Sequence, residues 1–368
     1  MSRAAVLGSG PGGLAIAAEL SERGHEVSLA DAPGFSHQLE AVRDRGGVIV
    51  DCNWSGDVTQ SVDVADSIAA AVSEAELVVV SVPAAVHQLF IEAVLPYLQR
   101  GSILLFVGEG GGCLVAWPEL RRVGREDVLL GETNCLPYMA RPAGQGRVLA
   151  NRKQGGVLVA AMPAARGPEL FAVASSMWPY AEQAETVWET ALVNYDAIDT
   201  VPVAVTSAAK LEGRSGGVLF WGEGATESVV RLIEALDEEL LALRHALGHA
   251  DHRRYRDFLV AQGLAPDSGD LYRVMRAGGI ARSYRPSGDP TALHDRLALE
   301  VGYCLVLASS LGAAIGVDTP VIDGHIALSD ALLQRSFRTE GRTLARLGLA
   351  ELNTDQLTHY VRTGSPDR

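Results

Sequence analysis

The chain has 368 residues, of which 48% are hydrophobic and 21% charged, and its formal net charge is −14. This composition is sufficient for a large core, and a chain longer than about 250–300 residues usually divides into two domains. The acidic balance argues against nucleic acid or an anionic membrane as partner, because their phosphates would be repelled.

The cysteines and the apolar segments bear on where the protein works. Cys52, Cys113, Cys135 and Cys304 have neither CxxC nor metal-ligand spacing, so we expect reduced, buried thiols and no metal site. The first residues lead directly into a predicted strand without a signal peptide, and we find no apolar run long enough to cross a bilayer. The sequence therefore predicts a cytoplasmic protein with no membrane partner.

A glycine-rich turn follows the first predicted strand, 4–7, and precedes a helix with apolar residues on its inner face. Gly8 permits the tight turn, Gly10 lets the backbone approach a pyrophosphate, and Gly13 allows close packing of helix on strand. Asp31 ends the second predicted strand, where a carboxylate accepts hydrogen bonds from a ribose diol. We predict a dinucleotide site formed by Gly8, Gly10, Pro11, Gly12, Gly13 and Asp31.

The same residues predict which nicotinamide cofactor is preferred. Asp31 would face the 2′-phosphate of NADP(H) with like charge, and the following Ala32-Pro33-Gly34 provides no arginine to neutralise that phosphate. We therefore expect NAD(H) to be preferred, with NADP(H) as a second cofactor.

Strand-like runs alternate with helical stretches through the first half of the chain, at 4–7, 26–30, 48–50, 77–81, 102–107, 128–130 and 155–162. This alternation predicts a parallel sheet with helices on both faces. From about Thr186, long amphipathic stretches show helical spacing and no strand is evident. We predict an α/β Rossmann-type N-terminal domain over 1–185, an all-α C-terminal substrate domain over 186–368, and a ligand cleft between them.

Two segments follow predicted strands at the sheet edge where ligands bind in open α/β folds. The buried run beginning at residue 77 leads into Val82 and Pro83, which we place beside the nicotinamide ribose; a plain strand-ending proline explains them equally well. The later segment GETNCLPYMAR ends at Arg141, whose planar guanidinium suits a substrate carboxylate. A surface ion pair is the alternative for Arg141.

Several segments spread over nearly the whole chain are similar to one known family. They are VLGSGPGG, VVVSVPAAVH, GETNCLPYMAR, LVNYDAID, WGEGATESVVRLIEALDEE, VDTPVIDG and FRTEGRTLARLGL. In these segments the chain resembles the octopine/nopaline (opine) dehydrogenase family. The resemblance implies an oxidoreductase that uses NADH or NADPH to reduce the imine formed between a 2-oxo acid and the amine of an amino acid.

The resemblance also implies a catalytic histidine after an Asn-rich helix start, with an acidic partner on a later helix. Asn194 is retained as a substrate-binding residue, but Thr200 stands where the histidine belongs, beside Asp199, and the partner position falls on Glu300. Because a threonine hydroxyl does not titrate near neutral pH, we expect a carboxyl group with a pKa raised by burial to donate the proton. Asp196, Asp199 and Glu300 are the candidates, with helix-surface or capping positions as the alternative.

His294 is a second source for the missing imidazole. It stands near the start of the predicted helix that carries Glu300, so it could reach substrate from the other wall of the cleft. A helix cap or a surface position is the alternative for His294.

Two other functions fit the same residues. One is a hydroxy-acid dehydrogenase that interconverts an alcohol and a ketone, and the other is a catalytically silent protein that binds NAD(H). The missing histidine favours the silent protein, whereas the glycine turn fits all three functions. A homodimer is compatible with the sequence, which does not identify the substrate pair.

Overall fold

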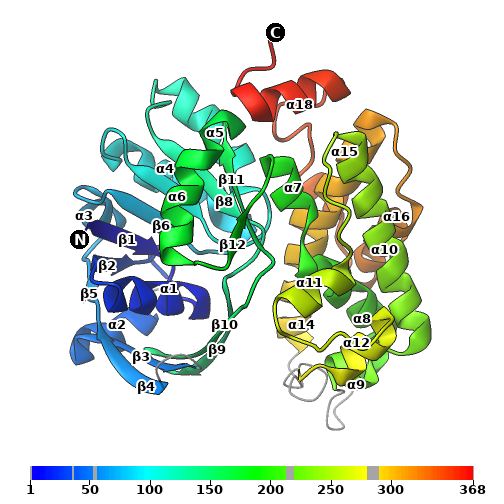
Figure 1. Ribbon diagram of the computed structural model, residues 1–368, viewed down its shortest axis with the longest axis horizontal. Helices are drawn as coiled ribbons and strands as arrows, with labels where there is room; N and C mark the ends of the chain where they lie inside the picture. Colours follow the sequence, from blue (N-terminus) through cyan, green and yellow to red (C-terminus); the bar gives the residue numbers. More distant parts are fainter. Residues whose placement is uncertain (1, 35–36, 53–55, 213–218, 280–289, 368) are drawn as a thin grey trace. The chain divides into compact units, whose positions relative to one another are not determined.

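The computed structural model describes residues 2–34, 37–52, 56–212, 219–279 and 290–367. Their contacts divide the chain into two compact units, drawn in Figure 1. An α/β unit comprises Met1–Lys153, Val157–Thr190 and Val361–Gly364. A helical unit comprises Gln154–Gly156, Ala191–Tyr360 and Ser365–Arg368. The predicted fold class, a Rossmann-type α/β part followed by an all-α part, is confirmed; the main division falls after Thr190, and the predicted boundary was residue 185.

The main sheet of the α/β unit has eight described strands in the order β12-β11-β8-β7-β6-β1-β2-β5. All neighbouring pairs are parallel except β11 and β8, which run antiparallel, so the predicted parallel sheet is confirmed with one antiparallel pair. The strands are β1 (Arg3–Leu7), β2 (Glu26–Ala30), β5 (Asp63–Val64), β6 (Leu77–Val80), β7 (Ile103–Phe106), β8 (Leu129–Thr133), β11 (Val157–Met162) and β12 (Ala181–Gln183).

A second sheet, of four described strands in the order β4-β3-β10-β9, was not predicted. The strand expected at 48–50 belongs to it and not to the parallel sheet. In that strand Val48 and Val50 are buried while Asp51 is exposed, and such alternation is typical of a strand covered on one face. The strands are β3 (Gly47–Cys52), β4 (Gly56–Ser61), β9 (Tyr138–Gly144) and β10 (Arg147–Arg152).

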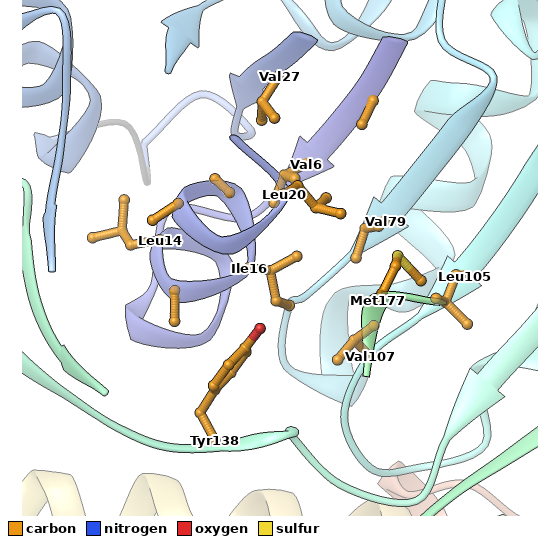
Figure 2. Close-up of a cluster of buried hydrophobic side chains, with 14 of the residues drawn as sticks. Val6, Leu14, Ile16, Leu20, Val27, Val79, Leu105, Val107, Tyr138 and Met177 are labelled. Carbon is orange, nitrogen blue, oxygen red and sulfur yellow. The ribbon is translucent and has the colours of Figure 1, made fainter. Parts of the chain in front are cut away.

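Helix α1 (Pro11–Glu22) packs against both sheets, and its residues from Gly12 to Leu20 are all buried. Figure 2 shows Tyr138 of β9 pointing its hydroxyl at α1, where it donates to the buried Glu19. Glu19 also forms ion pairs with Arg23, at 2.8 Å, and with Arg152 of β10, at 2.5 Å. A buried carboxylate is costly unless such partners satisfy it, so this cluster fastens the second sheet to the helix.

The core around α1 is apolar on the side of the main sheet. Val6, Val27, Val79 and Leu105 from four strands lie near the helix together with Met177 (Figure 2). Burying each such side chain contributes about 1.5–3 kcal/mol, which makes this layer the rigid base of the unit. The remaining helices of the unit are α2 (His37–Arg45), α3 (Ile68–Val72), α4 (His87–Val94), α5 (Gly112–Arg122) and α6 (Gly167–Met177).

The helical unit contains no strand among its described residues. Its longest helix, α10 (Glu227–Ala246), packs against α8 (Tyr195–Leu211) and α16 (Pro320–Leu333). The other helices lying within the unit are α9 (Phe220–Glu223), α11 (Tyr255–Ala261), α12 (Leu271–Ala277), α14 (Pro290–Leu299), α15 (Val306–Ile315) and α17 (Phe337–Glu340). Two more, α7 (Val187–Leu192) and α18 (Thr354–Thr363), span points where the chain passes from one unit to the other.

A π-helical turn, Glu300–Leu305, joins α14 directly to α15. Turns of this kind are rare and frequently occur at functional sites, because the wider winding re-aims the side chains.

The helix through this turn corrects the expectation about apolar segments. The run Leu297–Ile315 has a mean hydropathy of 1.7 over its most apolar window and is long enough to cross a membrane by length and composition alone. In the structure 61% of that window is buried, as in the core helix of a soluble protein.

Candidate active site

The glycine turn at the start of α1 has the geometry that the sequence predicts. Gly8 has φ +108°, and a Cβ there would lie 2.3 Å from the carbonyl oxygen of Ser81. A Cβ on Gly13 would lie 1.9 Å from the carbonyl oxygen of Gly8, so helix and strand approach more closely than any side chain allows. A Cβ on Gly10, by contrast, would meet no atom within 4 Å.

A cavity of about 370 Å³ opens at this turn. The N-terminus of α1 lies at the cavity, with no side-chain cap and no acidic residue in its first turn, so its backbone N–H groups and dipole favour an anion there. The open space beside Gly10 is the room that a pyrophosphate requires. The lining residues are Gly8, Ser9, Gly10, Pro11, Leu14, Asp31, Gln38, Ser81, Val82, Pro83, Val86, Phe90, Pro142, Gly144 and Arg147.

Most of the predicted cofactor residues line this cavity, and two support it from behind. Gly8, Gly10, Pro11, Asp31, Val82 and Pro83 are in the lining. Gly12 packs closely against residues outside the turn, since a Cβ there would lie 2.8 Å from the Leu136 side chain and 2.9 Å from the Ser81 hydroxyl. Gly13 sets the separation of helix and strand, as described above.

Asp31 is held rigidly at the edge of the cavity. Its Oδ2 accepts hydrogen bonds from the backbone N–H of Ser9, at 2.7 Å, and from the Ser9 hydroxyl, at 2.6 Å. Its Oδ1 accepts from the backbone N–H of Ala32, at 2.7 Å. The carboxylate is therefore oriented before any ligand arrives, which lowers the entropic cost of binding a ribose hydroxyl.

Part of the cavity wall comes from residues that the sequence analysis missed. Gln38 of α2 and Pro142, Gly144 and Arg147 of the β9–β10 hairpin belong to the lining, although the hairpin lies outside the main sheet. A sequence signal was available: two glycines flank Gln145, and a short glycine-containing turn between two strand-like runs indicates a hairpin.

Arg141 is half-buried on β9 and is not among the residues that line the cavity. Because side chains alternate along a strand, Arg141 points to the face opposite that of its neighbour Pro142. Its assignment to a substrate carboxylate stays a prediction.

In the helical unit, Asn194 and Glu300 are brought together through Cys304. Asn194 caps α8, accepting a hydrogen bond from the backbone N–H of Ala197 at 3.0 Å. Its amide donates to the sulfur of Cys304, whose thiol lies 3.8 Å from Oε2 of Glu300. Glu300 is 6% exposed and begins the π-helical turn. Cys304 was not predicted as part of this cluster, because it lies 110 residues from Asn194 along the chain.

A second polar cluster lies on the next turn of α8. Asp199 accepts hydrogen bonds from the Tyr255 hydroxyl, at 2.5 Å, and from the Thr200 hydroxyl, at 3.1 Å. Thr200 is fully buried and Asp199 is 5% exposed. Burial, and then the negative charge of Asp199, raise the pKa of Tyr255, which keeps this phenol protonated as a donor. Tyr255 was not predicted as a site residue.

His294 lies at the surface of the helical unit, whereas Asp199, Thr200 and Glu300 are buried. Its side chain is 43% exposed and lies 3.7 Å from the carboxylate of Glu212, itself 53% exposed. Within the helical unit this is the surface position that the sequence analysis gave as the alternative.

Comparisons with known proteins agree with this organisation. Residues 183–333 match the family described as NAD/NADP octopine/nopaline dehydrogenase, alpha-helical domain, and residues 4–147 match ketopantoate reductase PanE/ApbA. An opine dehydrogenase from Arthrobacter sp. (strain 1C) is 30% identical over 350 residues, which is 95% of each chain.

Solved structures share the fold at lower identity. An octopine dehydrogenase in complex with NADH and agmatine has a TM-score of 0.78 at 15% identity, covering 99% of this chain and 98% of that one. A yersinopine dehydrogenase with NADP+ bound has a TM-score of 0.71 at 13% identity, covering 98% of each chain. The match to the Arthrobacter enzyme over nearly the full length shows the family that the sequence predicted: this chain belongs to the opine dehydrogenases.

Proposed function

We propose that this protein is a nicotinamide-dependent oxidoreductase that reduces the imine formed from an oxo acid and the amine of an amino acid. The observation that carries the proposal is the cavity at the glycine turn, with the open N-terminus of α1 and the fixed carboxylate of Asp31. Family membership adds the reaction type, since the similar octopine dehydrogenase was solved with NADH together with agmatine.

The α/β unit supplies cofactor binding in this proposal. The first turn of α1 binds the pyrophosphate, and Asp31 accepts hydrogen bonds from the adenosine ribose. Val82 and Pro83 follow β6 and lie along the nicotinamide half. A bound NADH or NADPH supplies the hydride, and the preference is for NADH because Asp31 repels a 2′-phosphate.

The helical unit supplies the proton. Condensation of the carbonyl with the amine releases water and leaves a C=N bond; hydride adds to its carbon and a proton to its nitrogen. Glu300 is our candidate for the proton donor, because it is a buried carboxyl group at the start of the π-helical turn, 3.8 Å from the thiol of Cys304. Asp199 already accepts from two hydroxyl groups, which suits a fixed acceptor that orients its neighbours.

The remaining predicted residues take supporting parts. Thr200 occupies the family's histidine position without replacing its chemistry. Asn194 caps α8 and contacts Cys304, and Arg141 is proposed to contact a substrate carboxylate. His294 stays the second candidate for an imidazole at the substrate.

The test is the dependence of NADH oxidation on both substrates. The proposal expects oxidation only when an oxo acid and an amino acid or amine are present together. If NAD+ is reduced by a hydroxy acid alone, the protein is instead a hydroxy-acid dehydrogenase. If NADH binds tightly but no substrate pair in a broad panel is reduced, the protein is a silent NAD(H)-binding protein.

We also propose that the protein works in the cytoplasm, as a homodimer, without nucleic acid or membrane partners. The net charge of −14 supports the absence of such partners, and all four cysteines are buried and unbridged. Light scattering of the purified protein measures its oligomeric state directly.

A further inference from the structure

The cofactor cavity is lined by a cation as well as by an anion, although the sequence next to Asp31 contains no cation. After Asp31 the chain continues with Ala32-Pro33-Gly34 and offers no cation. Among the described residues that line the cavity, however, Arg147 is the one cation and Asp31 the one anion. Arg147 comes from β10 of the second sheet, a segment remote in sequence from the glycine turn.

The hairpin turn that precedes Arg147 is fixed against α2, the helix that follows the Asp31 segment. The backbone N–H of Gly146 donates to Oε1 of Gln38, at 2.9 Å. The carbonyl oxygen of Gly146 accepts from Nη1 of Arg45, at 3.3 Å, and from the backbone N–H of Ile49, at 3.1 Å. In a Rossmann fold the loop after the second strand borders the adenosine ribose, so these bonds hold the turn at that end of the cavity.

The base of the hairpin is fixed as well. Tyr138 at the start of β9 and Arg152 at the end of β10 both contact Glu19 of α1. The hairpin is therefore tied to α1 at one end and to α2 at the other. The backbone that carries Arg147 is thus already ordered, so a ligand that binds there need not order the segment.

We propose that Arg147 binds the 2′-phosphate of NADPH and is, with Asp31, the second determinant of cofactor choice. Asp31 favours NADH, whose ribose carries free hydroxyls, while Arg147 offers a planar donor group that suits a phosphate. The two opposite charges in one cavity explain how a chain with an acid after its second strand admits NADPH. The inference rests on the proposed nicotinamide function and adds the residue that reads the phosphate.

The experiment measures the dissociation constants of NADH and NADPH by fluorescence titration of the full-length protein. A hydrogen bond to a charged group contributes about 1.5–3 kcal/mol, so Arg147→Leu is expected to weaken NADPH about 10–100-fold. NADH affinity should change by less than about threefold, because NADH has no 2′-phosphate. Arg147→Lys keeps the charge and should retain part of the NADPH affinity.

Two further variants sharpen the test. Asp31→Asn should tighten NADPH binding, since it removes the like charge. Arg122→Leu is the matched control: Arg122 lies on α5, pairs with Glu119 and is 65% exposed, so it makes the same charge change away from the cavity. It should leave the affinity for both nucleotides unchanged.

The outcomes separate this inference from the proposed function. A larger loss for NADPH than for NADH in Arg147→Leu supports it. An equal loss for both would place Arg147 on the shared pyrophosphate and overturn the inference, as would no loss for either. If the unmodified protein binds neither nucleotide, the proposed function fails and the inference fails with it.

Discussion

The two units of this protein differ in how the chain encodes their functional residues. In the α/β unit a single stretch from Gly8 to Asp31 provides the turn, the helix start and the ribose carboxylate, and backbone geometry does most of the work. In the helical unit the polar clusters join Asn194 to Cys304 and Asp199 to Tyr255, residues far apart in sequence. A cofactor site made of backbone is thus visible in a short motif, whereas a site made of side chains depends on tertiary packing.

The first prediction tests whether the helical unit carries the acid–base chemistry. Glu300→Gln keeps the shape of the side chain but removes the acidic proton, and we expect kcat to fall about 10²–10⁴-fold, the usual range for general acid–base groups. The dissociation constant for NADH should not change, because the cofactor cavity described here belongs to the α/β unit.

Glu227→Gln is the control for Glu300→Gln, since Glu227 is exposed in the first turn of α10. Unchanged turnover in Glu300→Gln, and likewise in Asp199→Asn, would contradict the assignment of the proton donor to either carboxyl group.

The second prediction concerns the charge buried behind Tyr255. Asp237 accepts a hydrogen bond from the backbone N–H of Tyr255 at 3.0 Å, and burial raises the pKa of Asp237 to about 6. Because the pKa of Asp237 is higher in the folded protein than in the unfolded chain, its protonation favours the folded state. The unfolding free energy is therefore highest below the unfolded-state pKa, about 3.9, and falls as the pH rises through about 6. Asp237→Asn should therefore be more stable than the unmodified protein at pH 8, by about 2–3 kcal/mol.

Urea denaturation at pH 4.5 and at pH 8 measures this difference. The gain in unfolding free energy for Asp237→Asn should shrink at the lower pH. An equal gain at both pH values would show that the charge of Asp237 is not the cause.

The sequence predicted the order of elements and the cofactor turn because those features depend on local patterns. Gly13 is required by a contact within the motif itself and Gly8 by its positive φ, and Asp31 follows a strand that alternation identifies. The position of Arg147 in the cavity depends on how a second sheet packs on α1, which no local pattern specifies. Tyr255 and Cys304 were missed for the same reason. The strand at residues 48–50 was assigned to the wrong sheet, because its apolar residues fit either sheet and the exposure of Asp51 beside them is seen only in the structure.

The third prediction separates the two uses of glycine in the cofactor turn. Gly10→Ala places a methyl group in open space, so it should leave stability unchanged while weakening NADH about 10–100-fold by obstructing the pyrophosphate. Gly13→Ala forces a Cβ against the Gly8 carbonyl and should lower the unfolding free energy by about 1–3 kcal/mol, the usual cost of overpacking. Thermal unfolding and NADH titration of both variants give the two readouts. If Gly10→Ala binds NADH normally, the pyrophosphate does not lie at the start of α1.

The last prediction concerns the segment FRTEGRTLARLGL, which carries part of the family resemblance but had no assigned role. Gly341 in this segment lies against the π-helical turn: a Cβ there would be 2.2 Å from the carbonyl oxygen of Gly302. The next residue, Arg342, donates its backbone N–H to that same carbonyl at 2.8 Å, and its guanidinium lies 5.3 Å from the ring centre of Tyr303. The segment therefore supports the turn that begins with Glu300.

Gly341→Ala should push this support away from the turn, lowering the unfolding free energy by about 1–2 kcal/mol. Because Glu300 is two residues from Gly302, kcat should also fall, by less than in Glu300→Gln, with NADH affinity unchanged. Gly324→Ala is the matched control, since Gly324 lies in α16 and a Cβ there meets no atom within 4 Å. A fall in stability without any fall in kcat would show that the segment stabilises the helical unit but does not position Glu300. A selective fall in kcat would show that the segment containing Gly341 positions Glu300. The proton donor would then depend on a segment about 40 residues away along the chain, which is why a local sequence pattern does not reveal it.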